Sequence, residues 1–241
     1  MGKLGRYWEY SRSPFYSYLF VLPLLFFYEF LAQVVNRGQM VQVRNAADVF
    51  VKALLSLLGV HGLFYAAVVL AAVAGIFIFY YDAKHRDQGI RLDYLVLMFG
   101  ESIIYACLFG GIVSRIVILL FPLAQPLGFD FSVSFMVALG AGIYEELVFR
   151  VLLMGGLIWM GKQGFKLGPV AAVLFGVIAS ALLFALFHYL GPLGDSFTWH
   201  SFLFRFVAGI VLAGLYAVRG FGITVYTHTL YDVLLTLQGL R

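Results

Sequence analysis

Two adjacent carboxylates and an arginine interrupt an apolar stretch of the chain, at Glu145, Glu146 and Arg150 in the string GIYEELVFR. The flanking residues 131–144 and 151–160 are together long enough to cross a bilayer, which takes about 20 residues. A charged group at the centre of a spanning helix costs about 2.5–3.5 kcal/mol, so three unpaired ones would cancel most of the flanks' contribution. We therefore expect these groups to be paired and to serve a function.

Helical spacing separates the two glutamates. Positions i and i+4 share a face, whereas adjacent positions diverge by about 100°. The spacing therefore predicts an ion pair between Glu146 and Arg150 and places Glu145 in a different environment. A poorly solvated carboxylate can act as a general base near neutral pH, which makes Glu145 the candidate for activating water.

Two later apolar segments carry further polar groups, His188 and the i, i+4 pair of His228 and Asp232. A histidine can hold an attacking water or donate a hydrogen bond to a developing oxyanion. Each of these residues alone is open to a purely structural interpretation, because polar groups also join helices in membranes. Together they place a costly polar group on each of three helices, and this combination predicts a hydrolytic site.

The helices that must position these groups follow from composition. Of 241 residues, 63% are hydrophobic and only 12% are charged, against about 25% in soluble domains. This predicts an all-α, polytopic transmembrane helix bundle of seven to eight spans. Segment 46–60 is short and carries Asp48 and Lys52, so an amphipathic helix at the interface is favoured over an eighth span. The seven expected spans are residues 15–35, 62–82, 93–121, 132–160, 168–190, 199–218 and 221–238.

No linker or low-complexity tract divides the sequence, which predicts a single integral membrane domain over residues 1–241, with the motif-bearing core at about 130–238. The net charge of +4 comes from Lys and Arg residues scattered among the loops, so the expected partner is the lipid bilayer and not nucleic acid. Glu29, Glu101, Arg115 and Arg205 are interpreted as partners of other polar groups or as side chains that extend to the interface.

Loop charges predict the orientation. One set of alternate loops holds Lys and Arg residues, whereas the opposite loops, 122–131 and 191–198, hold none and only Arg241 follows at the C-terminus. By the positive-inside rule the first set is cytoplasmic, which places the polar cluster between the midplane and the non-cytoplasmic side. We expect a multi-pass protein of the bacterial plasma (inner) membrane. The cytoplasmic set is Lys84, Arg86, Arg91, Lys162, Lys166 and Arg219.

Three motifs occur in order on successive hydrophobic segments: EELVFR (E-E-x-x-x-R), FALFH at 184–188 (F-x-x-x-H) and HTLYD at 228–232 (H-x-x-x-[N/D]). In this order they resemble the CAAX-protease and bacteriocin-processing (CPBP/ABI) family of glutamic intramembrane proteases, over about residues 130–238.

The resemblance implies a role for each matching residue. Glu145 would activate water with help from His188, and His228 with Asp232 would form the oxyanion hole. Catalysis would need no metal. The members that cleave prenylated proteins are expected to carry Asn where this chain has Asp232, and an ionised Asp cannot donate a hydrogen bond. Asp232 is then either kept protonated or orients His228, and we favour the second role. The supporting residues would be Glu146, Arg150 and Phe184.

The predicted function is therefore hydrolysis of a peptide bond in or beside a transmembrane or C-terminal anchoring segment of an exported, membrane-anchored protein or peptide. CAAX-type prenyl-protein or peptide-pheromone processing is the alternative substrate class. A zinc site built from two histidines and a glutamate is a minor alternative mechanism, although no H-E-x-x-H spacing is present. A proton-coupled carrier or a non-catalytic scaffold is the remaining alternative.

Overall fold

The computed structural model describes residues 2–39, 42–82, 89–120, 130–191 and 194–238, and every regular element in these ranges is helical, which confirms the all-α class. The helices are α1 (Lys3–Ser11), α2 (Pro14–Val35), α3 (Ala46–Leu57), α4 (Leu63–Tyr81), α5 (Leu92–Leu120), α6 (Phe131–Gly140), the π-helices η2 (Ala141–Glu145) and η3 (Leu147–Met154), α7 (Gly155–Gln163), α8 (Pro169–Phe187), α9 (Trp199–Arg219) and α10 (Phe221–Leu237).

Within the described ranges, five helices are long and apolar enough to cross a membrane: Pro14–Val35, Leu63–Tyr80, Leu92–Val113, Pro169–Phe187 and Trp199–Arg219. They coincide with five of the expected spans and support an integral membrane protein, but the count of seven to eight is not confirmed. The other two expected spans fall on the consecutive elements α6, η2, η3 and α7 and on α10, which has 17 residues.

The outward faces of these helices are also apolar. Phe77 and Phe79 on α4 are each 60% exposed, and Leu174 on α8 is 55% exposed. A soluble protein rarely exposes so much contiguous apolar surface, whereas lipid tails solvate it. The side chains that face outward therefore fit a bilayer environment.

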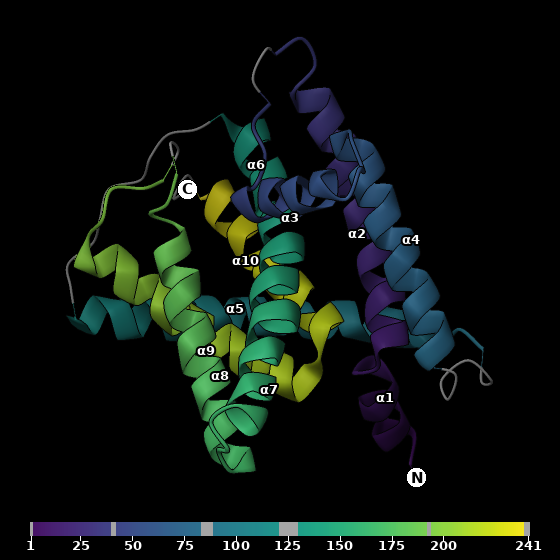
Figure 1. Ribbon diagram of the computed structural model, residues 1–241, viewed down its shortest axis with the longest axis vertical. Coiled ribbons are helices and arrows are strands. Elements are labelled where there is room, and N and C mark those ends of the chain that lie inside the picture. Colours follow the sequence, from purple (N-terminus) through teal and green to yellow (C-terminus); the bar gives the residue numbers. More distant parts are fainter. Residues whose placement is uncertain (1, 40–41, 83–88, 121–129, 192–193, 239–241) are drawn as a thin grey trace.

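Segment 46–60 differs from the sequence-based expectation. Helix α3 has 12 residues, fewer than a bilayer crossing requires, so it is no eighth span. An interfacial helix would turn Asp48 and Lys52 toward water, yet both are buried, with 0% and 3% of their surface exposed. Figure 1 shows α3 lying crosswise to α2 and α6, and it packs on α4 and η2. The charged face of α3 points into the protein because Asp48 and Lys52 form ion pairs there with Arg44 and Glu29.

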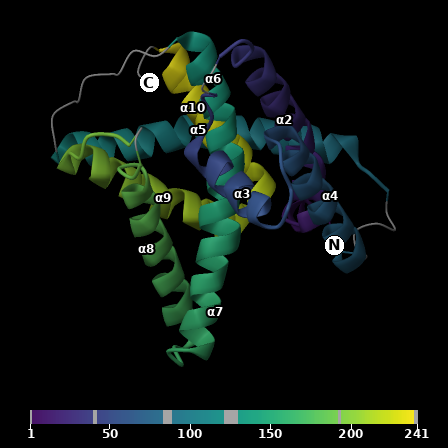
Figure 2. The ribbon, with the colours of Figure 1, turned by 45° about the horizontal axis from the view of Figure 1, so that its top comes forward.

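Helix α10 is the centre of the arrangement, because it packs against α2, α5, α6, α9 and η2. Helix α5 runs crosswise to α2 and α4 in both views, and α7 and α8 lie side by side (Figures 1 and 2). Helices η2 and α10 approach each other closely at Gly142, where an added Cβ would lie 2.8 Å from the carbonyl oxygen of Val225 and 2.9 Å from the backbone nitrogen of Thr229. Only glycine allows this contact.

Candidate active site

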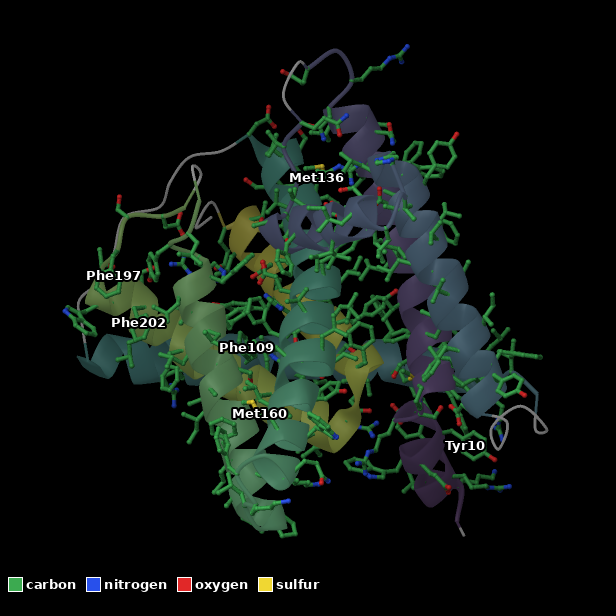
Figure 3. All side chains as sticks on the ribbon, in the orientation of Figure 1. Tyr10, Phe109, Met136, Met160, Phe197 and Phe202 are labelled. Carbon is green, nitrogen blue, oxygen red and sulfur yellow. The ribbon has the colours of Figure 1, made fainter. Side chains whose placement is uncertain are left out.

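The polar residues singled out in the sequence converge where η2, the end of α8 and the middle of α10 meet. Glu145 and Glu146 lie near the middle of the continuous helical run 131–163, whose opposite ends are marked by Met136 and Met160 in Figure 3. Glu145, Glu146, His228 and Asp232 are all at most 7% exposed. Lipid-buried carboxylates of this kind need close partners, and each partner defines part of the site.

Glu146 joins two helices. Its Oε2 lies 3.1 Å from Nε of Arg150, the i, i+4 pair that the spacing predicts, and both side chains are fully buried. Its Oε1 accepts a hydrogen bond of 2.8 Å from Nδ1 of His228 on α10. The sequence did not indicate this second contact, because nothing in a single chain shows which residues of distant helices face each other.

The guanidinium of Arg150 lies over the ring of Phe184, 4.8 Å from its centroid. Phe184 also packs edge-on against His188 and lies near His228, with ring centroids 4.9 and 6.4 Å apart. The aromatic residue of the second motif therefore touches the arginine of the first motif and both histidines. This gives Phe184 a physical role as the packing surface of the site.

Glu145 faces away from Glu146, toward α3 and α8. Its Oε1 accepts a hydrogen bond of 2.7 Å from Nδ2 of Asn45, and its Oε2 lies 4.0 Å from Nε2 of His188. The Nδ1 of His188 is 2.8 Å from the carbonyl oxygen of Phe184, which can only accept, so Nδ1 carries the proton and Nε2 of the neutral ring presents a lone pair. The His188 side chain is 24% exposed, which makes it the accessible side of the pair.

His228 and Asp232 also lie close, with Nε2 and Oδ2 3.6 Å apart. Glu146 lies at 2.8 Å from the other ring nitrogen, so two carboxylates face His228 and the orienting role of Asp232 stays a prediction. The carboxylate of Glu146 keeps a proton on Nδ1 and leaves Nε2 turned toward Asp232.

A network of buried charges underlies Glu145. Arg44 contacts Glu29 and Asp48 at 3.0 and 3.1 Å, and Lys52 contacts the same two carboxylates at 2.5 and 2.6 Å. Burial lowers the pKa of Arg44, but the two carboxylates outweigh it and raise that pKa, so the guanidinium stays charged. The hydroxyls of Tyr28 and Tyr144 donate to Asp48 and Glu29.

Two of the other residues interpreted as partners, Glu101 and Arg205, also form ion pairs, whereas Arg115 is exposed. Glu101 accepts hydrogen bonds of 2.5 and 2.7 Å from Arg219, and Arg205 pairs with Asp195. Arg219 was counted among the cytoplasmic loop charges, but it is fully buried and its charge is neutralised inside the protein. Lys84 and Arg86 of the same cytoplasmic set lie outside the described residues. Arg241 and loop residues 122–129, which belong to the opposite set, lie outside them as well.

The helix that carries the glutamates is not a regular α-helix. Residues 141–145 and 147–154 have π-helical hydrogen bonding, which is rare and occurs mostly at functional sites. The wider turn was not predicted, because no residue preference distinguishes it from an α-helix in a sequence. Among the described residues, no group of three or more His, Cys, Asp or Glu side chains is placed to hold a metal ion.

The apolar helices, with a cluster of carboxylates and imidazoles buried among them, support an integral membrane protein with a polar site in its interior. Residues 127–234 match the family model described as Type II CAAX prenyl endopeptidase Rce1-like, and the match covers all three motifs. The resemblance drawn from the motifs is thereby confirmed over this segment, which covers 108 of the 241 residues and is similar to CAAX protease-like membrane proteins. Neither curated proteins nor solved structures gave a match to the chain.

Proposed function

We propose that the protein is a glutamic intramembrane endopeptidase in which Glu145 and His188 activate a water molecule. The observation that carries the proposal is the 4.0 Å separation of Glu145 Oε2 and His188 Nε2. The distance is too long for a direct hydrogen bond and suits a water that donates one hydrogen to each acceptor. Such a water is oriented and is in contact with a base.

In the proposed reaction Glu145 takes a proton from this water while the water oxygen attacks the carbonyl carbon of the scissile peptide bond. A tetrahedral oxyanion forms, and His228, protonated on both ring nitrogens between the carboxylates of Glu146 and Asp232, donates to it from Nε2. The proton held by Glu145 then passes to the leaving nitrogen and the C–N bond breaks. The products are one new carboxylate and one new amine.

The proposed substrate is an exported or membrane-anchored polypeptide that is cut in or beside a transmembrane or C-terminal anchoring segment. The proposal includes seven crossings, with the 131–163 run and α10 added to the five candidate spans, and a site that opens to the non-cytoplasmic side of a bacterial plasma membrane. The absence of Lys and Arg from the sequence of loops 122–131 and 191–198 supports this orientation. Topology reporters that place these loops in the cytoplasm would exclude it.

Prenyl-protein processing is the second candidate, and the match to a family of CAAX prenyl endopeptidases favours it. The residue at position 232 distinguishes the two candidates, because this chain carries Asp where the prenyl-cleaving members are expected to carry Asn. The mechanism as proposed requires no metal, with zinc as the competing mechanism.

The test compares the termini of membrane and secreted polypeptides in host cells that carry the wild type or Glu145→Gln at equal levels. New termini that depend on wild type and cluster beside predicted transmembrane segments would support the proposal and reveal the substrates. Glu9→Gln on α1 is the matched control, because it makes the same chemical change away from the site, and it should yield the wild-type termini. Identical termini with Glu145→Gln and wild type would favour a carrier or scaffold.

A further inference from the structure

Asn45 lies outside the matched segment 127–234, yet it makes a close polar contact with Glu145. The Nδ2 of Asn45 is 2.7 Å from Oε1 of Glu145, and the two residues are 5% and 6% exposed. The contact joins positions 100 residues apart in the sequence. A hydrogen bond to a carboxylate is charge-assisted and is stronger than one between neutral groups.

The orientation of the Asn45 amide is fixed by the helix that it begins. Asn45 is the N-cap of α3, and its Oδ1 accepts from the backbone N–H groups of Ala47 at 2.9 Å and Asp48 at 3.4 Å. Those N–H groups can only donate, so Oδ1 must face them and Nδ2 must face Glu145. One side chain therefore both caps a helix and holds a carboxylate.

The position of Asn45 is held from two sides. Arg44, its neighbour in the chain, is bound to Glu29 and Asp48 in the buried network. On the other side, α6 presents Gly140, where an added Cβ would lie 3.0 Å from Cβ of Asn45 and 2.7 Å from the ring of Tyr28. A larger residue at 140 would push Asn45 away from Glu145, so the glycine permits the short contact.

We propose that Asn45 is a positioning residue for Glu145 and that α3 is therefore part of the active site. This inference rests on the proposed function. By occupying Oε1, Asn45 fixes the carboxylate plane and leaves Oε2 turned toward Nε2 of His188, where the water is to be bound. Without the amide donor, the carboxylate can rotate about its side-chain bonds and the oxygen that acts as base loses its fixed place.

The test uses Asn45→Asp, which keeps the shape of the side chain and the oxygen that caps α3 but replaces the donor by a carboxylate oxygen. With a peptide that spans the cleavage site identified in host cells, we expect kcat to fall about 10–100-fold while KM stays within about 2-fold. The thermal unfolding midpoint should fall in Asn45→Asp, because a second carboxylate is then buried beside Glu145, and should stay close to that of wild type in Asn45→Ser, which adds no charge. Asn45→Ser, which also keeps a capping oxygen, should show the same split between kcat and KM.

Thr198→Ala is the matched control, since it removes the side-chain cap of α9, which accepts from Ser201, without touching Glu145. It should lower the unfolding midpoint and leave kcat unchanged. Wild-type kcat in Asn45→Asp, or a loss of activity that only follows a loss of folded protein, would overturn the proposal. If wild type shows no cleavage that depends on Glu145, the proposed function itself fails, and Asn45 then has no reaction to serve.

Discussion

Replacing Gly142 by alanine tests whether the contact between η2 and α10 sets the geometry of the site. The new Cβ would overlap the hydroxyl of Thr229 and lie 2.8 Å from the carbonyl oxygen of Val225 and 2.9 Å from the backbone nitrogen of Thr229. The hydroxyl can rotate away, but the backbone atoms cannot. Helix α10 must therefore retreat until these contacts reach about 3.4 Å, where ordinary contact begins.

The retreat would act on the chemistry through His228, which follows Thr227 and precedes Thr229 on α10. Its 2.8 Å hydrogen bond to Glu146 would lengthen toward the 3.5 Å limit of a hydrogen bond. Overpacking a core by one methyl group costs about 1–3 kcal/mol, and a misplacement of about 1 Å can lower a rate about 100-fold. We expect Gly142→Ala to lower kcat about 10–100-fold although every polar side chain of the site is retained.

The assay is the rate at which the termini that depend on Glu145 are formed, with thermal unfolding in detergent as the measure of folding. Gly156→Ala is the matched control, because it lies in the same helical run and nothing lies within 4 Å of its added Cβ. Alanine is also the better helix former, by about 0.8–1 kcal/mol, so this control should be active and at least as stable as wild type. Wild-type kcat in Gly142→Ala would refute the argument that this contact positions His228.

Three further predictions follow from the contacts described above. Lys52→Met should lower the free energy of unfolding by about 3–5 kcal/mol, because it leaves a buried carboxylate uncompensated. Combining it with Glu29→Gln should cost less than the sum of the two single changes, and additive losses in the free energy of unfolding would contradict the network. Asp232→Asn should keep activity within about 10-fold of wild type, because Glu146 makes the close contact with His228, and a loss as large as that of His228→Ala would assign Asp232 a direct role. Dialysis against a metal chelator should leave the cleavage rate unchanged, whereas a loss that zinc restores would support the metal mechanism.

Helical spacing and the cost of charge in lipid account for the part of the site that could be predicted. The Glu146–Arg150 pair follows from i, i+4 geometry, and the convergence of Glu145, His188 and His228 follows from expected spans that coincide with observed helices. The first inference needs only the geometry of one helix. The second needs only the direction in which successive helices run.

Contacts between distant segments could not be predicted in this way. Two such contacts are the hydrogen bonds from Asn45 to Glu145 and from His228 to Glu146. They depend on how each helix is rotated about its own axis, and a helix that is apolar on every face has no sequence pattern that specifies this rotation. The Asn before AADVF is a recognisable N-cap, but that signal indicates the start of a helix and not what its amide faces. Helix α3 was assigned to the interface because its segment is short and carries Asp48 and Lys52. The sequence does not show that Lys52 meets Glu29, which lies 23 residues away in the chain.

The buried charge network also has a consequence for the order in which the protein assembles. Asp48 and Lys52 can leave water only when Glu29 and Arg44 neutralise them, and the hydroxyl of Tyr144 completes the shell of Glu29. Tyr144 is made about a hundred residues later than these groups. The four charges can therefore pair as soon as residues 29–52 are made, whereas the contacts with Tyr144 and Glu145 can form only after the helix that bears them has been inserted. Packing of α3 against that helix completes the shell of Glu29 and places Asn45 beside Glu145 in the same step, so that the last step of folding also completes the site.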